Sequence, residues 1–258
     1  MNLNAAQASS QAQFDKQSGR YGKSHILADT SDLDELADGL ELPTSGIALD
    51  VATGGGHAAL WLTRRGFDVT ATDISERMLE NAAALVSGDG KRIQTSQHPA
   101  ETLPYPDASF DVITCRVAAH HFSSPGDFVR ESARLLKSGG FLLLIDGTVP
   151  DNELEAADWM NIVEKLRDPS HGRLLSPGEW RRIVESADMQ IVRCSVSRLI
   201  QPDLEWYFET ADTPASNRDI ITARYENAAD SIRNVYEFAT VDGRRTWQWH
   251  RLHLAARK

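Results

Sequence analysis

A glycine-rich turn flanked by two carboxylates is the part of this chain whose residues most clearly favour ligand binding. An apolar run at 47–51 leads into residues 53–56, Thr-Gly-Gly-Gly, and a helix-like stretch covers 57–65. A second apolar run, 69–72, ends on Asp73. Glycines let the backbone approach a ligand closely, and an acid at the end of the second strand can accept hydrogen bonds from both ribose hydroxyls. This order predicts a βαβ unit that binds an adenosine-like nucleotide.

The residue before the turn bears on which nucleotide binds. Gly54, Gly56 and Ala59 also fit the G-x-G-x-x-A pattern of a dinucleotide site. Asp50, however, lies near the end of the first strand, where the pyrophosphate of a dinucleotide would lie against the helix N-terminus. A carboxylate repels phosphate and suits a ligand with an ammonium group and no phosphate, such as S-adenosylmethionine (SAM). The alternative is that Asp50 only braces the turn through backbone hydrogen bonds.

Four segments resemble the motifs of class I SAM-dependent methyltransferases. LDVATGGGHAAL resembles the first motif, although Ala52 stands where that family most often has glycine. VTATDISERMLENAA, AETLPYPDASFDVITCRVAAHHF and RESARLLKSGGFLLLID follow in order and resemble the later motifs. Together they cover roughly residues 45–147. Within the superfamily the chain is most similar to the small-molecule branch typified by ubiquinone and menaquinone biosynthesis (methyltransferase type 11).

The resemblance implies a set of SAM-binding residues. Asp73 would bind the ribose, Ala100 and Glu101 would lie at the adenine, and Tyr21 would lie against the methionine part. Arg116 would pair with the SAM carboxylate or with an anionic substrate, unless it only caps backbone carbonyls. The full expected set is Tyr21, Asp50, Ala52, Thr53, Gly54, Gly56, Asp73, Ile74, Met78, Ala100, Glu101 and Arg116.

Three histidines are the candidates for catalysis. Methyl transfer is an in-line displacement, so the enzyme's main task is to hold nucleophile and methyl group roughly 3–3.5 Å apart. A base is needed only if the nucleophile must lose a proton. His120 and His121 follow the fourth strand, and His171 lies in LRDPSHGR. We expect at most one of the adjacent pair to face the pocket. No metal is expected, because the histidine spacing matches no metal-binding motif.

Two other functions compete with methyl transfer. An NAD-dependent dehydrogenase would explain the glycine pattern but leave the three later motifs unexplained. A protein of the same fold could also bind SAM and transfer no methyl group, because catalysis of this kind can rest on positioning alone.

The elements expected around these residues form one α/β domain, residues 1–258. Strands are expected at 46–51, 68–72, 91–95, 109–115, 141–146, 190–198 and 246–256, and helices at 57–65, 75–86, 126–137 and 177–187. Their alternation predicts a Rossmann-like, seven-stranded, mostly parallel sheet with helices on both faces. The resemblance implies the strand order 3-2-1-4-5-7-6 with the last strand antiparallel. Residues 1–20 are expected to be frayed or loosely helical.

Two insertions, 147–176 and 199–245, are too long for plain loops and carry apolar residues at helical spacing. We expect them to form a helical cap over a core of about 40–147, 177–198 and 246–258; a dimerisation surface is the alternative. Aromatic residues of the cap would either line the pocket or fill the cap's own core: Trp159, Trp206, Tyr207 and Phe208.

The composition of the chain limits which classes of binding partner are expected. The net charge of −10 and pI near 5.3 argue against a nucleic-acid substrate. No apolar run is long enough for a membrane span, the N-terminus lacks the pattern of a secretory signal, and two cysteines form no disulfide framework. The expectation is a cytoplasmic enzyme with a small, largely apolar acceptor, which the resemblance implies is aromatic or quinone-like, and a homodimer is left open.

Overall fold

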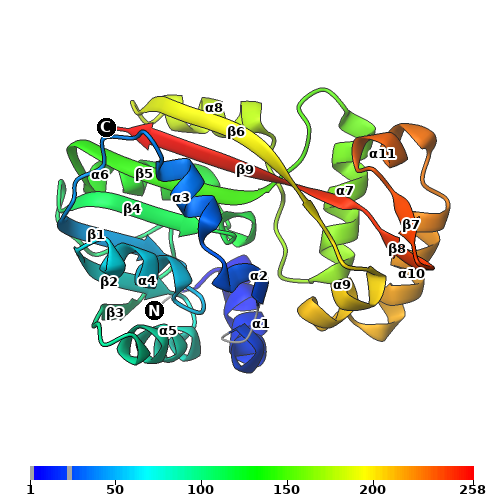
Figure 1. Cartoon of the computed structure of the whole chain (residues 1–258), viewed down its shortest axis with the longest axis horizontal. Coiled ribbons are helices and arrows are strands. Elements are labelled where there is room, and N and C mark those ends of the chain that lie inside the picture. The colour runs from blue at the N-terminus through cyan, green and yellow to red at the C-terminus, as the bar shows by residue number, and fades with distance from the viewer. Residues whose placement is uncertain (1–2, 22–24) are drawn as a thin grey trace.

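The computed structural model describes residues 3–21 and 25–258, except the side chains of residues 20, 21, 25 and 26. Its centre is a seven-stranded sheet in the order β3-β2-β1-β4-β5-β9-β6 (Figure 1). Strand β9 runs antiparallel to both β5 and β6, and the other neighbouring pairs are parallel. The predicted α/β class, strand order and antiparallel last strand are therefore confirmed. The strands are β1 (Gly46–Val51), β2 (Phe67–Asp73), β3 (Gln94–Gln97), β4 (Phe110–Arg116), β5 (Leu136–Thr148), β6 (Gln190–Ile200) and β9 (Gln248–Arg257).

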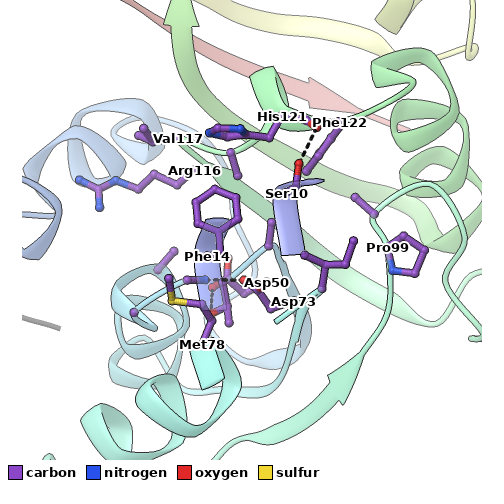
Figure 2. Close-up of a pocket in the computed structure, with 18 of the residues that line it drawn as sticks. Ser10, Phe14, Asp50, Asp73, Met78, Pro99, Arg116, Val117, His121 and Phe122 are labelled. Carbon is purple, nitrogen blue, oxygen red and sulfur yellow. Dashed lines mark hydrogen bonds between the residues drawn. The ribbon is translucent and has the colours of Figure 1, made fainter. Parts of the chain in front are cut away.

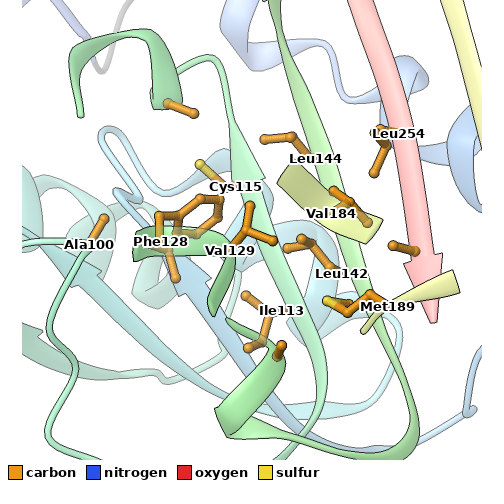
Figure 3. Close-up of a cluster of buried hydrophobic side chains, with 14 of the residues drawn as sticks. Ala100, Ile113, Cys115, Phe128, Val129, Leu142, Leu144, Val184, Met189 and Leu254 are labelled. Atoms are coloured by element: carbon orange, nitrogen blue, oxygen red, sulfur yellow. The ribbon is translucent and has the colours of Figure 1, made fainter. Parts of the chain in front are cut away.

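Helices cover both faces of the sheet because the central strands are apolar on both sides. In β5, Leu142 and Leu144 face the cluster formed with α6 (Pro125–Leu135) and α8 (Pro177–Glu185) (Figure 3). The intervening Leu143 and Ile145 face the opposite cluster, formed with α3 (Ser31–Ala37), α4 (His57–Arg64) and α5 (Glu76–Gly88). Alternate side chains of a strand point to opposite faces, so one apolar run supplies both layers.

The predicted boundaries differ from the structure in a few places. Strand β3 begins three residues later than expected, and β5 is longer at both ends. Residues 1–20 were expected to be frayed or loosely helical, and α1 (Ala5–Tyr21) is one continuous helix. The helix α2 (His25–Ala28) and α3 were not predicted. Helix α1 has no apolar stripe, and its Gln side chains contact the core and the cap through hydrogen bonds instead. Hydrophobic periodicity therefore could not indicate this helix.

The two insertions form a lobe beyond the carboxyl ends of β4 and β5 (Figure 1). It contains α7 (Leu154–Arg167), α9 (Leu204–Ala211), α10 (Ala215–Glu226) and α11 (Asp230–Val235), and it has its own apolar core. A hairpin of β7 (Ala239–Val241) and β8 (Arg244–Thr246) completes it. The hairpin was not predicted, although its turn residues Asp242 and Gly243, both at positive φ, are a known hairpin signal. Within the described residues, no helix is long and apolar enough to cross a membrane.

Candidate active site

Asp50 holds the turn between β1 and α4 together. Its carboxylate accepts hydrogen bonds from the hydroxyls of Thr53 and Thr114, each at 2.6 Å. Burial raises the pKa of Asp50 to about 6, against the opposing effect of these two bonds. The side chain therefore braces the turn, through these two hydroxyls and also through the backbone N–H of Ala59. Asp50 also lines a pocket. With a pKa of about 6, its carboxyl group is mostly ionised at pH 7.

Asp73, at the end of β2, is a second buried carboxylate beside the same turn. Its oxygens accept from the backbone N–H groups of Gly54 and Ser75, each at 2.9 Å. Burial raises the pKa of Asp73 to about 6, and the charge of Asp50 adds to the effect. The carboxylate thus joins the glycine turn to the start of α5.

Two turn positions show why small residues are needed here. Ala52 has a φ of 54°, a left-handed conformation that costs an alanine more than a glycine. Gly56 has a φ of 86°, and a Cβ there would lie 2.6 Å from the Cα of Ala82. The left-handed conformation at residue 52 explains why glycine is preferred at that position of the motif. Gly56 acts through the close approach of α4 to α5.

The first pocket lies over this turn (Figure 2). All expected SAM-binding residues line it except Gly56 and Tyr21. Tyr21 is the last residue of α1, and its side chain lies outside the described part of the structure. Sequence reasoning missed the other lining residues, which are Gln7, Ser10, Phe14, Leu27, Gly55, His57, Ala58, His98, Pro99, Val117, Ala118 and Phe122; His121, expected as catalytic, also lines it.

Helix α1 supplies three of the missed residues because it lies across the pocket. The Gln11 side chain donates to the carbonyl of Ile74 at 2.9 Å, and Gln7 donates to Glu101 at 3.0 Å. Phe14 makes an edge contact with His121, with ring centroids 4.8 Å apart. Apart from Tyr21, the α1 sequence carries no signal of this role, since its contacts are isolated polar bonds and a single ring contact.

The charged side chains of Glu101 and Arg116 line the first pocket, and both already form hydrogen bonds within the protein. Glu101 accepts from the backbone and hydroxyl of Ser123, at 2.8 and 2.7 Å. Arg116 pairs through Nε with Asp32 at 3.0 Å and donates to the carbonyl of Leu27 at 2.7 Å. This arrangement fits the alternative in which Arg116 caps carbonyls, and it anchors the segment before α3.

A second cavity of about 700 Å³ opens between the carboxyl edge of the sheet and the cap. It meets the first pocket at Leu27, Val117 and His121, which line both. Val117 has a φ of 55°, a strained conformation for a β-branched residue. Such strain gathers at functional sites. The cavity is lined by Gln17, Leu27, Val117, His120, His121, Gly147, Glu164, Arg167, Asp168, His171, Leu174, Trp206, Glu209, Thr210, Ala211, Asp212, Arg218, Trp249, His250 and Arg251.

All three candidate histidines line this second cavity. The rings of His120 and His121 are 4.2 Å apart between centroids, and His171 lies 5.2 Å from His120. The expectation that at most one of the adjacent pair faces a pocket was therefore wrong. The pair lies in a 3₁₀ turn, Ala119–His121, whose successive side chains are rotated by a third of a turn, not placed on opposite faces.

The three imidazoles differ in proton affinity. Burial disfavours the charged form of His120, but the Asp146 carboxylate, 2.6 Å from its Nδ1, outweighs this and raises its pKa above the usual value. Burial and the charge of His120 lower the pKa of His121 to about 3. Burial also lowers the pKa of His171 far below its usual range. Only His120 is poised to take up a proton near neutral pH.

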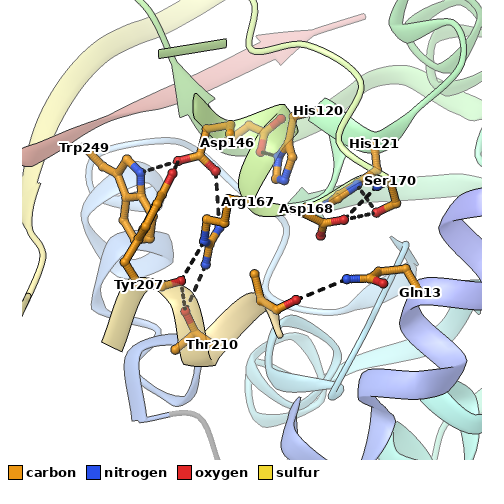
Figure 4. A network of polar contacts seen from close by, with 12 residues as sticks. Gln13, His120, His121, Asp146, Arg167, Asp168, Ser170, Tyr207, Thr210 and Trp249 are labelled. Atoms are coloured by element: carbon orange, nitrogen blue, oxygen red, sulfur yellow. Dashed lines mark hydrogen bonds and ion pairs between the residues drawn. The ribbon is translucent and has the colours of Figure 1, made fainter. Parts of the chain in front are cut away.

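A short relay orients His121 (Figure 4). The Ser170 hydroxyl donates to Asp168 at 2.7 Å and lies 3.1 Å from Nδ1 of His121. Because the hydroxyl hydrogen goes to Asp168, the serine oxygen accepts from Nδ1–H of His121. The Nε2 atom of His121 is then left as the acceptor, at the junction of the two pockets.

The cap aromatics divide between cavity and core. Trp206 lines the second cavity, whereas the other three expected aromatics are buried in the cap core. Glu164 and Trp249, which the sequence did not single out, also line the cavity. Glu164 accepts from Trp249 Nε1 at 2.8 Å and from the Tyr207 hydroxyl at 2.9 Å. Within the described residues, no group of three or more His, Cys, Asp or Glu is arranged to hold a metal ion.

Comparisons with known proteins agree with this geometry. Residues 49–144 match the model of a methyltransferase domain family. The chain is 32% identical to YcgJ, an uncharacterized methyltransferase of Bacillus subtilis, over 86% of this chain and 88% of that protein. It is 36% identical to the 27-O-demethylrifamycin SV methyltransferase of Amycolatopsis mediterranei, over 44% of this chain and 43% of that enzyme. The crystal structure of BH2331 from Bacillus halodurans C-125 is 31% identical and has a TM-score of 0.83, covering 88% of this chain and 99% of that one.

Asp73→Ala should weaken the binding of S-adenosylhomocysteine (SAH) by about 1–3 kcal/mol, because it removes the buried acceptor expected to bind the ribose. Isothermal titration calorimetry measures the effect. Asp68→Ala, an exposed position on the same strand, is the matched control and should bind SAH like the unmodified chain. Equal affinity of both variants would show that Asp73 does not contact the nucleoside.

Proposed function

Because the chain belongs to the class I SAM-dependent methyltransferases, we propose that its first pocket holds SAM and its second cavity holds a small organic acceptor. The chain then transfers the methyl group between them. The seven-stranded core and the cap act together as one domain, with the acceptor enclosed by the two insertions. A cytoplasmic location, a homodimer and the exclusion of nucleic acid stay predictions from the sequence.

The charges of the first pocket fit SAM. Its ionisable carboxylates are Asp50, Asp73 and Glu101, and its arginine, Arg116, is already paired with Asp32. A pocket with this balance attracts a sulfonium and an ammonium group and repels a pyrophosphate. It therefore supports SAM over the dinucleotide alternative. When bound, SAM supplies an electrophilic methyl group.

The junction of the two pockets is the observation that carries the proposal. Val117 and His121 line both spaces, so a methyl group at the end of the first pocket would face a nucleophile in the second. Methyl transfer depends chiefly on holding the two reacting atoms in line and excluding water. The cap encloses the acceptor side, and α1 covers the cofactor side.

A small-molecule acceptor is supported by the cavity and by the relatives. A volume of about 700 Å³ lies within the range of small-molecule sites. The ring systems of Trp206 and Trp249, 5.9 Å apart, favour an aromatic or other flat group. The relatives include methyltransferases named for 27-O-demethylrifamycin SV and for ubiquinone biosynthesis.

His120 acts as the base in this proposal. Its Nδ1 is held by Asp146 at 2.6 Å, which fixes the ring and leaves Nε2 to accept a proton from the acceptor. Asp146 is then the positioning residue. His121, neutral and oriented by Ser170, accepts a hydrogen bond at the junction instead of a proton. His171 is neutral as well, and its Nε2 has no partner among the described residues, so it is free to bind a polar group of the acceptor.

Transfer of a tritiated methyl group from SAM tests the function. Purified protein is screened against phenols, quinols, amines and thiols, with a cell extract as the source of macromolecules. We expect labelling of a small molecule, and a phenol or quinol above all, because the cavity lies between the sheet and the cap and is partly aromatic. Labelling of macromolecules only would contradict the small-molecule acceptor. SAH binding without any transfer would favour the non-catalytic alternative.

His120→Ala should lower turnover about 10²–10⁴-fold and leave SAH affinity unchanged. His253→Ala, which lies outside both pockets, is the control. Full activity of the alanine variants at 120, 121 and 171 would mean catalysis by proximity alone.

The pH profile tests the same base. In the unmodified chain, kcat/KM should rise as pH increases through the raised pKa of His120, because only the neutral ring accepts a proton. Asp146→Asn should move that rise to lower pH, since the carboxylate that raises the pKa is gone.

A further inference from the structure

Arg251 is a buried cation at the floor of the second cavity. It lies on β9, opposite Gly147 of β5 and Ser197 of β6. Its side chain is only 13% exposed and lines the cavity. Neither the sequence motifs nor the proposed chemistry uses this residue.

Arg251 shares its carboxylate partner with another arginine. Asp32 lies 3.0 Å from Arg116 and 3.6 Å from Arg251. Arg116 has the closer contact, through both carboxylate oxygens. Among the described residues, the side chain of Arg251 forms no hydrogen bond, and Asp32 is its only ion-pair partner. Asp32 is therefore shared by two guanidinium groups, and leaving the largely buried charged side chain of Arg251 without a hydrogen-bond acceptor is costly.

The other cations around the cavity are engaged. Arg167 donates to the carbonyl of Tyr207 at 3.0 Å and pairs with Glu164. Arg218 donates to the carbonyl of Thr213 at 3.2 Å. Among the described residues, the Asp146 carboxylate offsets part of the charge of Arg251 but makes its hydrogen bond to His120, at 2.6 Å, and none to Arg251.

Acidic side chains around the second cavity limit how much negative charge a ligand there can carry. The cavity is also lined by four acidic residues, Glu164, Asp168, Glu209 and Asp212. These carboxylates would repel a phosphate dianion. The Arg251 guanidinium, which lines the cavity and whose hydrogen-bond donors have no acceptor among the described residues, therefore fits a monoanion.

We propose that Arg251 binds a carboxylate of the methyl acceptor, so that the substrate class is an aromatic hydroxy acid. The planar guanidinium matches a carboxylate in a bidentate pair. The inference rests on the proposed function, because it places the acceptor in the same cavity.

Sheet geometry sets the distance between the two ends of this substrate. Strand β9 is the second neighbour of β4, with β5 between them. Strands lie roughly 4.8 Å apart, so the backbone at Arg251 is about 10 Å from the β4 exit, where the methyl group is expected. The long arginine side chain shortens this gap. One aromatic ring, lying near Trp206 and Trp249, would span the remainder, as in a hydroxybenzoate or hydroxycinnamate.

Calorimetry on the SAH-saturated full chain tests the proposal. The probes are 3,4-dihydroxybenzoate, caffeate and the methyl esters of both. Each acid should bind roughly tenfold to hundredfold more tightly than its ester, the range for hydrogen bonds to a charged group. Arg251→Gln should remove the preference for acids and leave ester binding and SAH binding unchanged. Arg251→Lys should keep part of the preference, which separates loss of charge from loss of fold.

The control is Arg257→Gln, the same substitution on the same strand at an exposed position outside the cavity. It should keep the full preference for acids. Equal binding of acids and esters, a preference that survives in Arg251→Gln, or no acid binding up to about 10 mM would each overturn the proposal. If SAH itself fails to bind, the proposed function fails first; if SAH binds normally, only the carboxylate assignment fails.

Discussion

The structure depends on two buried carboxylates that lie close enough to repel one another at the carboxyl edge of the sheet. Asp50 and Asp73 both lie beside the glycine turn, and burial raises the pKa of each to about 6. Hydroxyl and backbone donors hold them in place, yet no cationic side chain contacts either one among the described residues. Two unpaired buried anions are costly to the empty protein. We propose that a cationic ligand relieves that cost and that this is why the first pocket would prefer a sulfonium compound.

The second requirement is that acceptor and cofactor meet at one place. The β4 exit provides that place because Val117 adopts a left-handed conformation and turns the chain sharply into the histidine segment. Helix α1 then connects the two spaces: Asp15 accepts from Ser75 in the core at 2.6 Å, and Gln17 donates to Ala211 in the cap at 2.7 Å. The enclosed junction is therefore built from segments far apart in the sequence.

Much of the sheet and of the first pocket could be predicted, because their residues lie in one stretch whose strand and turn order fixes the geometry. The positions of Asp50, Gly54 and Asp73 follow from consecutive elements, although Thr114 of β4 also donates to Asp50. The place of helix α1 across the pocket could not be predicted, since its contacts are single polar bonds and one ring contact, without an apolar stripe. Nor could the partners of the histidines, because Asp146 and Ser170 reach them only through long-range packing. Arg251 approaches the site only because β9 inserts between β5 and β6.

The central claim is that the first pocket delivers a methyl group to the second cavity past Val117 and His121. A crystal structure of the chain with bound SAH tests this most directly. The account predicts the ribose on Asp73 and the sulfur facing Val117 and His121, open to the cavity under the cap. A sulfur atom separated from that cavity by α1, or a ribose bound away from Asp73, would contradict it.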